Sequence, residues 1–192
     1  MDSNSNYDVR SFKLTFDRIS TSLPNKIGHT FPNLQVLLVE YSRLKFIFKS
    51  NFENMSQLLV LSLQANEITD FSYDALWDLK NLRKIDLSRN NLIFLDQKLF
   101  QNMLNLETFH AHFNSLYYLD GRLFDNNLNL KTLTFDFNKI TVVGIDFEQL
   151  KLLTKVNLRD NVCINLEFPV DSLEKLSEQI RKNCNEALEL RK

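Results

Sequence analysis

Glycine, proline and cysteine are scarce in this chain of 192 residues, which contains only three, three and two of them. The shortage of glycine and proline excludes collagen-like and low-complexity chains, because both classes are rich in these residues. No uninterrupted apolar run approaches the roughly 20 residues that a membrane-spanning helix needs. Residues 1–8 are polar and contain no apolar segment of a secretory signal. The net charge is only −1, so we expect no nucleic-acid partner, which would favour a strongly basic chain.

Motifs that carry out chemistry are also missing. The chain contains no GxSxG, HExxH or GxGxxG motif and no phosphate-binding P-loop. The two cysteines stand 21 positions apart, which is not a spacing typical of metal ligands. We therefore expect a protein without catalytic activity, cofactor or metal.

A repeated leucine pattern dominates the part of the chain that follows. One leucine recurs four times at an interval of 24 residues and then once at 23, at Leu34, Leu58, Leu82, Leu106, Leu130 and Leu153. Other apolar columns repeat in phase with it, and the ninth position of five units is asparagine: Asn66, Asn90, Asn114, Asn138 and Asn161. A period of this length indicates a solenoid, in which each coil buries its apolar side against the next.

Each column has a physical reason. In the LxL stretch, alternate side chains point to opposite faces of a short strand, so the leucines point inward and their neighbours point outward. The asparagine amide can bond backbone groups that are left unpaired where the chain leaves the strand. The phenylalanine column, at Phe52, Phe100, Phe124 and Phe147, supplies large rings to fill the opposite side of each coil.

The complete pattern, LxxLxLxxNxLxxLxxxxFxxL, resembles that of the leucine-rich repeat family over residues 31–184. The resemblance implies an α/β fold, a right-handed horseshoe-shaped solenoid with a concave parallel sheet, a mostly irregular convex side and a C-terminal capping helix. We divide the chain into a disordered tail (1–8), a degenerate N-terminal repeat (9–30), the regular repeats (31–161) and a C-terminal cap with a helix (162–192).

The two ends depart from the regular pattern. Near the N-terminus, Phe12, Leu14 and Phe16 alternate with polar residues, which predicts a strand with one buried face. Apolar residues follow at the repeat spacing but about one residue out of register, at Ile19, Leu23, Ile27 and Phe31. Near the C-terminus, Asp171 followed by Glu174 predicts the start of a helix. Its apolar stripe is Leu173, Leu176, Ile180, Cys184 and Leu188.

The helix stripe brings the two cysteines into one region. Cys184 lies on the stripe, so it should face the end of the solenoid where Cys163 emerges. A disulfide there would close a loop of about 20 residues and stabilise the fold by roughly 3 kcal/mol in the chain-entropy model. Two buried free thiols are the alternative.

The segment LRDNVCINLEF, a helix and a second cysteine resemble the C-terminal cap of secreted leucine-rich repeat proteins. Together with SLPNKIGHTFPNL, it is similar to insect extracellular proteins related to mosquito leucine-rich immune proteins. This resemblance implies a Cys163–Cys184 disulfide, an extracellular location and a role in innate immunity. Members of that group usually begin with a signal peptide and a cysteine-bearing N-terminal cap, which this chain lacks. Either the sequence starts late, or the protein is cytoplasmic and its cysteines stay reduced, which is the alternative location.

The outward residues of the predicted strands form two apolar areas on either side of a basic centre. We predict that a protein partner contacts Val36, Leu38, Tyr41, Leu59, Arg83, Lys84, Asp86, Arg89, His110, His112, Phe113 and Phe137. Apolar anchors beside arginine are typical of protein-binding surfaces. Half-buried packing is the alternative for Phe113 and Phe137. The predicted function is thus a non-catalytic protein-binding module, and an intracellular scaffold or regulatory subunit with the same surface is the alternative.

The histidines allow a third hypothesis. His110 and His112 point outward from one strand, while Asp86 and Asp136 occupy the neighbouring coils. Two imidazoles and two carboxylates could hold zinc or respond to pH, as in a metal-binding protein or enzyme. Solvated polar pairs across a parallel ladder are the simpler interpretation.

One sequence motif indicates a modification. Asn54, Met55 and Ser56 form an N-glycosylation sequon, which applies if the chain is secreted. Met55 belongs to an inward column, so we expect Asn54 beside it to be exposed.

Overall fold

The structure is a computed structural model that describes residues 8–15, 19, 21–24, 26–169 and 173–184. The predicted tail lies outside these residues except for Asp8, and so do the predicted helix start at Asp171 and the stripe residue Leu188.

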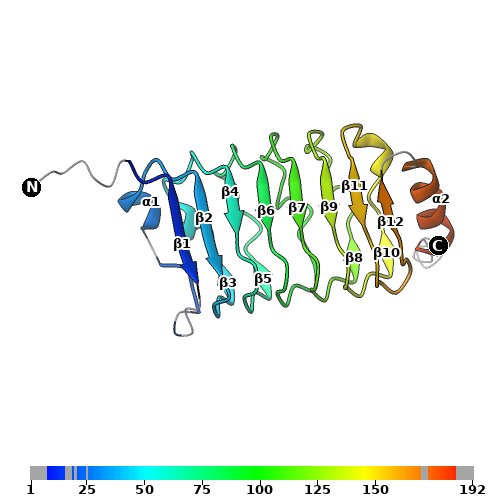
Figure 1. The fold of residues 1–192 in the computed structure, drawn as a ribbon, viewed down its shortest axis with the longest axis horizontal. Coiled ribbons are helices and arrows are strands. Elements are labelled where there is room, and N and C mark those ends of the chain that lie inside the picture. The colour runs from blue at the N-terminus through cyan, green and yellow to red at the C-terminus, as the bar shows by residue number, and fades with distance from the viewer. Residues whose placement is uncertain (1–7, 16–18, 20, 25, 170–172, 185–192) are drawn as a thin grey trace, which may run out of the picture.

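One eight-stranded sheet extends along the whole molecule (Figure 1). Seven strands are parallel: β1 (Ser11–Thr15), β2 (Val36–Glu40), β4 (Val60–Ser62), β6 (Lys84–Asp86), β7 (Thr108–His110), β9 (Thr132–Thr134) and β11 (Lys155–Asn157). The last strand, β12 (Glu167–Pro169), is antiparallel to β11. From β2 to β9, each strand residue pairs with the residue 24 positions further on in the next strand, for example Leu37 with Leu61. The leucine period therefore sets the register of the sheet.

The predicted inward columns form one continuous core. All six leucines of the first column are fully buried, as are Leu61, Ile85, Phe109 and Leu133 of the strand column. The phenylalanine column is buried as well, and the ring centroids of Phe100 and Phe124 stack 5.5 Å apart. The rings fill the space beneath the return arc of each coil, as the pattern predicts.

The asparagine column forms the predicted ladder. Asn90 illustrates it: its Oδ1 accepts a hydrogen bond from the Ile68 N–H of the preceding coil at 3.0 Å. Its Nδ2 donates to the Leu63 carbonyl of that coil at 2.9 Å and to the Leu87 carbonyl of its own coil at 3.0 Å. Equivalent bonds are made by Asn66, Asn114, Asn138 and Asn161. Each asparagine thus satisfies backbone groups of two coils.

The return arcs contain slightly more regular structure than the predicted irregular convex side. β3 (Phe46–Ile47) pairs with β5 (Asp70–Phe71), and β8 (Tyr118–Leu119) pairs with β10 (Val142–Val143). Two 3-10 helices, η2 (Lys49–Phe52) and η3 (Phe147–Gln149), follow in their own coils. These short elements form because each arc buries one apolar residue against the next coil, as Ile47 and Phe71 do.

The N-terminal coil is a distorted version of the others. β1 pairs with β2 at an offset of 25 residues instead of 24, which agrees with the predicted slip of register. Leu23 and Ile27, at the start of the short helix α1 (Ile27–Thr30), are buried. The expectation that Ile19 continues the apolar pattern is wrong, because its side chain is 92% exposed.

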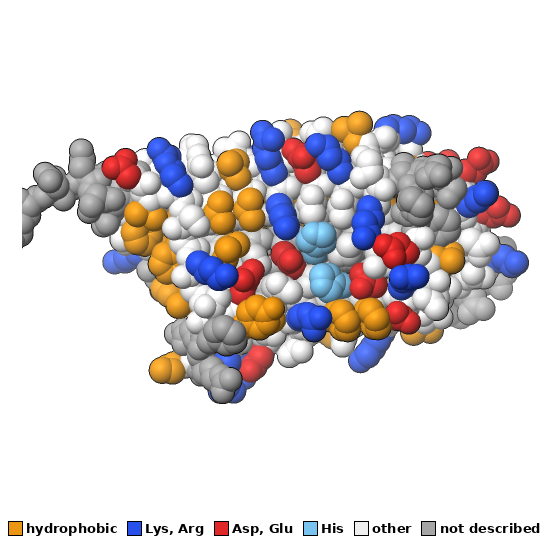
Figure 2. Space-filling view, viewed as in Figure 1, with side chains coloured by type: hydrophobic (Ala, Val, Ile, Leu, Met, Phe, Trp, Pro, Cys, Tyr) orange, Lys and Arg blue, Asp and Glu red, His pale blue; other side chains and the backbone are white. Residues whose placement is uncertain are grey.

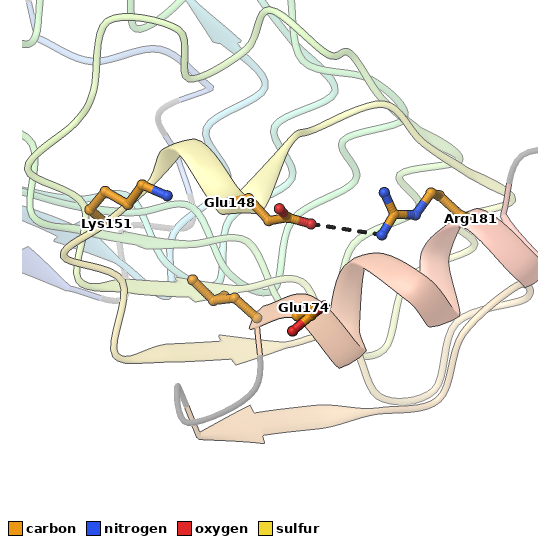
Figure 3. A pocket seen from close by; sticks show the side chains of 5 residues that line it. Glu148, Lys151, Glu174 and Arg181 are labelled. Atoms are coloured by element: carbon orange, nitrogen blue, oxygen red, sulfur yellow. Dashed lines mark ion pairs between the residues drawn. The ribbon is translucent and has the colours of Figure 1, made fainter.

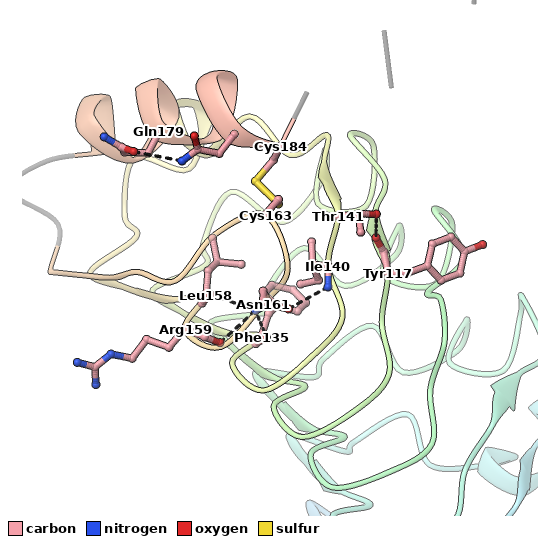
Figure 4. Close-up of a disulfide and its surroundings, with 11 residues drawn as sticks. Tyr117, Phe135, Ile140, Thr141, Leu158, Arg159, Asn161, Cys163, Gln179 and Cys184 are labelled. Carbon is pink, nitrogen blue, oxygen red and sulfur yellow. Dashed lines mark hydrogen bonds between the residues drawn. A yellow bond between two sulfur atoms is a disulfide. The ribbon is translucent and has the colours of Figure 1, made fainter. Parts of the chain in front are cut away.

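The helix α2 (Leu173–Asn183) covers the last coil and packs against η3. Leu176, Ile180 and Cys184 of its stripe are buried. Cys184 forms a disulfide with Cys163 across a Cα–Cα distance of 5.1 Å (Figure 4). The helix stripe and the paired cysteines therefore lie where the sequence places them.

Candidate protein-binding surface

The outward side of the eight-stranded sheet, here called the concave face, carries the predicted partner-binding residues (Figure 2). At its N-terminal end, Val36 pairs in register with Val60 on the next strand, and Leu38 lies on the same side of β2. These side chains and Leu59 are half-buried. Hydrophobic side chains gather over this end of the face in Figure 2. The first predicted apolar area is therefore a single patch.

The basic residues at the centre of the face differ in their contacts, since among the described residues Arg83 is paired with a carboxylate and Lys84 is not. Arg83 forms an ion pair with Glu107 at 3.3 Å, and Lys131 pairs with the same carboxylate at 2.6 Å. The hydrogen bond from Lys131 lowers the pKa of Glu107 below its usual value, and the charges of both basic groups contribute. Lys84 is exposed, and no carboxylate of the described residues lies within ion-pair distance of it. Lys84 can thus pair with an acidic group of a partner.

In six successive coils, the residue just before the position of the asparagine column has a left-handed backbone. We call this set the rim row: Tyr41, Ala65, Arg89, Phe113, Phe137 and Asp160, with φ between 51° and 56°. The N–H groups of the first five donate to carbonyls of the next coil, for instance Phe113 to Asp136 at 2.9 Å. The conformation turns the backbone inward to the asparagine and leaves the rim side chain pointing to solvent. Tyr41 is 47% exposed, Phe113 37% and Phe137 45%.

Three neighbouring side chains of the rim row form a stack. The rings of Phe113 and Phe137 lie 4.3 Å apart and are inclined by only 5°. The guanidinium carbon of Arg89 lies 4.4 Å from the centre of the Phe113 ring, in cation–π geometry. In Figure 2, hydrophobic and basic side chains accordingly lie side by side along one rim of the face. The two phenylalanines therefore pack on each other and still expose ring surface.

The two histidines lie between the apolar patch and the stack. The Nδ1 atom of His110 is 3.0 Å from Thr134 Oγ1, and that of His112 is 2.8 Å from Ser88 Oγ. Burial lowers the pKa of His110, and the negative charge of Asp86 in the adjacent strand partly opposes this. Among residues 8–15, 19, 21–24, 26–169 and 173–184, no three His, Cys, Asp or Glu side chains come together as metal ligands. The hydroxyl contacts agree with the simpler interpretation, polar pairing across the ladder.

A pocket of about 370 Å³ lies away from these residues, between η3 and α2 (Figure 3). Its lining is mostly charged: Glu148, Lys151, Glu174 and Arg181, with Leu173. Arg181 and Glu148 pair across it at 3.8 Å. None of the predicted partner-binding residues lines this pocket. The ion pair across it links the cap helix α2 to the last coil.

The sequon is accessible. Asn54 is exposed, with a left-handed φ of 60°, while Met55 is 1% exposed, as predicted. The Asn54 Nδ2 atom lies 2.9 Å from His29 Nε2 in the first coil.

The repeat geometry agrees with comparisons to known proteins. A family model described as leucine rich repeat matches residues 32–92. The chain has the leucine-rich repeat fold. The crystal structure of the APL1 leucine-rich repeat domain matches it with a TM-score of 0.71 at 18% identity, over 79% of this chain and 47% of that chain. At the level of the fold, this match supports the resemblance to insect leucine-rich repeat proteins.

Two other solved structures share the leucine-rich repeat fold. An internalin (inlF) from Listeria monocytogenes gives a TM-score of 0.67 at 19% identity, covering 88% of this chain and 46% of that one. The TLR13 protein in a complex titled TLR13-ssRNA13 gives a TM-score of 0.67 at 25% identity, covering 81% of this chain and 21% of that one. This chain therefore spans less than half the length of each of these structures.

No curated protein matches the chain in sequence. In the part of the chain that the structure describes, no helix has the length and apolar character needed to cross a bilayer. Leucine-rich repeat proteins generally bind other proteins.

The rim row contains one feature that sequence reasoning missed. The left-handed backbone at Tyr41, Arg89, Phe113 and Phe137 is not signalled by glycine. Its fixed position immediately before the asparagine column is the signal that could have predicted it. Asp160 completes the row at the C-terminal end and was not among the predicted partner-binding residues.

Proposed function

We propose that this chain is a non-catalytic recognition module that binds a protein partner through its concave face. One observation carries the proposal: the rim row exposes Tyr41, Arg89, Phe113 and Phe137 along one edge of the sheet. Tyrosine and arginine are enriched among the residues that dominate binding energy at protein interfaces. The adjoining patch of Val36, Leu38, Leu59 and Val60 adds half-buried apolar surface.

The same proposal includes an extracellular role in recognition and, by resemblance, in innate immunity. The Cys163–Cys184 disulfide supports this location, because disulfides persist in oxidising compartments. Counting free thiols in protein isolated from its native source tests it. We expect none, whereas two would favour the intracellular scaffold.

The surface is tested by affinity capture from the native source with two matched triple variants. The first carries Tyr41→Ala, Arg89→Ala and Phe113→Ala on the rim row. The control replaces the same residue types on the return arcs, Tyr117→Ala, Arg122→Ala and Phe94→Ala, all of which are exposed.

We expect the control to retain the partners of the unmodified chain and the rim variant to lose them. Replacing interface anchors costs about 2 kcal/mol or more each, so at least a 30-fold loss of affinity is expected. Partners retained equally by both variants would refute the assignment to the concave face. A circular dichroism melt of each variant establishes that both are folded.

A further inference from the structure

The stack of rim side chains has two ends, and the chain itself covers only one of them. At the N-terminal end, the Arg89 guanidinium covers one face of the Phe113 ring, 4.4 Å from the ring centre. The second face of Phe113 contacts Phe137, at 4.3 Å between centroids. The sequence order along the rim is therefore guanidinium, ring, ring.

At the C-terminal end, the next rim residue after Phe137 is Asp160. The Phe137 N–H donates to the Arg159 carbonyl at 3.0 Å, so the coil that carries Asp160 lies directly beside the ring. Among the described residues, Phe113 provides the only ring or cation contact of Phe137. With 45% of Phe137 exposed, the outer face of its ring is available to a ligand.

The basic side chain that directly precedes Asp160 in the sequence is paired elsewhere. Arg159 directly precedes Asp160, but its Nη1 pairs with Glu167 on β12 at 3.1 Å. Lys155 pairs with the same carboxylate, also at 3.1 Å. Glu167 thus draws both local cations toward the cap strand and away from the aromatic stack.

Two aspartates occupy positions next to Phe137, one along the chain and one at the same rim position of the next coil. Asp160 is exposed, and Asp136 precedes Phe137 on the concave face. In the described part of the chain, neither carboxylate has a basic group within ion-pair distance. An aromatic face beside an unpaired carboxylate attracts a cation twice, through the ring quadrupole and through direct charge.

We propose that the outer face of Phe137 and the Asp160 carboxylate bind one arginine side chain of a protein partner. A planar guanidinium can stack on the ring and donate two hydrogen bonds to a carboxylate, which an ammonium group cannot do with the same geometry. The partner's arginine repeats, at the open end of the stack, the contact that Arg89 makes at the other end. This assignment rests on the proposed function, because it places a partner on the concave face.

The test is an NMR titration with Nα-acetyl-arginine amide at constant ionic strength, followed through the Phe137 ring and the Asp160 amide. Nα-acetyl-citrulline amide, which has the same shape without the charge, is the neutral control ligand. We expect saturable shifts with the arginine compound only, with a dissociation constant in the millimolar range because a single exposed contact is weak.

Three variants locate the site. Phe137→Leu keeps an apolar side chain but removes the ring, and Asp160→Asn removes the charge. Each should raise the dissociation constant about two- to fivefold. Tyr117→Leu is the matched control, because Tyr117 is 53% exposed but its neighbours at the same position of adjoining coils, Ile93 and Thr141, are uncharged. It should leave the constant unchanged.

Equal shifts with the citrulline compound, or unchanged binding in Phe137→Leu, would overturn the assignment. The outcome is separable from that of the proposed function. Arginine binding combined with partners retained by the rim triple variant would refute the recognition surface but keep this site. Loss of partners without any arginine response would refute this site alone.

Discussion

At the scale of single residues, each coil combines an unfavourable backbone with a favourable side chain. A left-handed conformation costs a residue other than glycine roughly 1 kcal/mol or more. The rim residues, such as Arg89 with φ 56°, adopt it in each of the six coils from Tyr41 to Asp160. The next residue, such as Asn90, offsets this cost with hydrogen bonds to two coils. Because the backbone and the asparagine hold the turn, the rim side chain itself is free to serve binding.

The asparagine ladder leads to a prediction at this scale. Replacing Asn90 by alanine leaves the buried Ile68 N–H without its hydrogen-bond partner, while the Leu63 carbonyl keeps the bond from Asn66 Nδ2. We expect the free energy of unfolding to fall by about 1–3 kcal/mol, because an unsatisfied buried polar group costs about that much. Urea denaturation measures the change.

The neighbouring Asn91 provides the control. It is exposed, and its side chain makes no hydrogen bond with the described residues. Asn91→Ala should therefore change stability by less than about 0.5 kcal/mol. Similar losses in both variants would mean that the ladder does not stabilise the solenoid.

At the scale of elements, the cap closes the last coil in three ways. The buried stripe of α2 packs on the core, β12 adds an antiparallel edge to β11, and the disulfide joins helix to coil. Ion pairs from Lys155 and Arg159 to Glu167 hold β12 as well, but such exposed pairs contribute little. The apolar end of a solenoid needs such a cover, because a terminal coil has no further neighbour.

Reduction of the disulfide gives the prediction at this scale. Opening the Cys163–Cys184 loop, with a sequence separation of 21, should lower the free energy of unfolding by roughly 3 kcal/mol. The measurement compares urea denaturation with and without reductant.

A variant with Cys163→Ser and Cys184→Ser is the control, since reductant should not affect it. If the denaturation midpoint of the unmodified chain is the same with and without reductant, the disulfide does not contribute to stability.

At the scale of the whole molecule, stability is close to a sum over coils and their interfaces. Every described strand from β2 to β9 meets its neighbour at the same 24-residue offset. The coils are therefore interchangeable in register, although their rim side chains differ. The length of the binding surface depends on the number of coils.

Deleting one complete coil tests this description. Removal of residues 83–106 joins Leu82 to Glu107 and keeps every column in phase. We expect a folded and less stable chain, with a urea m-value lower by roughly one eighth, because the m-value follows the surface exposed on unfolding.

Removal of only residues 83–94 is the control, since it joins Leu82 to Leu95 and places apolar columns out of phase. We expect it not to fold. A full-coil deletion that also fails to fold would show that specific neighbours, such as the Phe100, Phe109 and Phe124 rings, matter more than the period.

Much of the fold could be predicted because the columns are both periodic and chemically distinct. Leu82 and Leu106 are placed in the core without knowing their contacts, because their column is in phase with the LxL and asparagine columns. The interval of 24 residues alone is not sufficient, since Leu104, Leu128 and Leu152 share it and are at least half exposed. Ile19 shows the limit: it is apolar and near the pattern, yet it is 92% exposed. The arrangement of the surface was harder to predict, because contacts such as that between Phe113 and Phe137 form only when the coils stack.

The sequence by itself determined the period, the inward columns and the asparagine ladder, and it placed Cys163 and Cys184 in one region. These features follow from hydrophobic burial and from backbone groups that must be satisfied, both of which act through local pattern. Only the tertiary structure decided that Arg89, Phe113 and Phe137 form one stack and that Asp160 stands at its open end. Residues 24 positions apart become neighbours only when the coils are stacked, and the direction of each rim side chain depends on a backbone conformation that its residue type does not reveal.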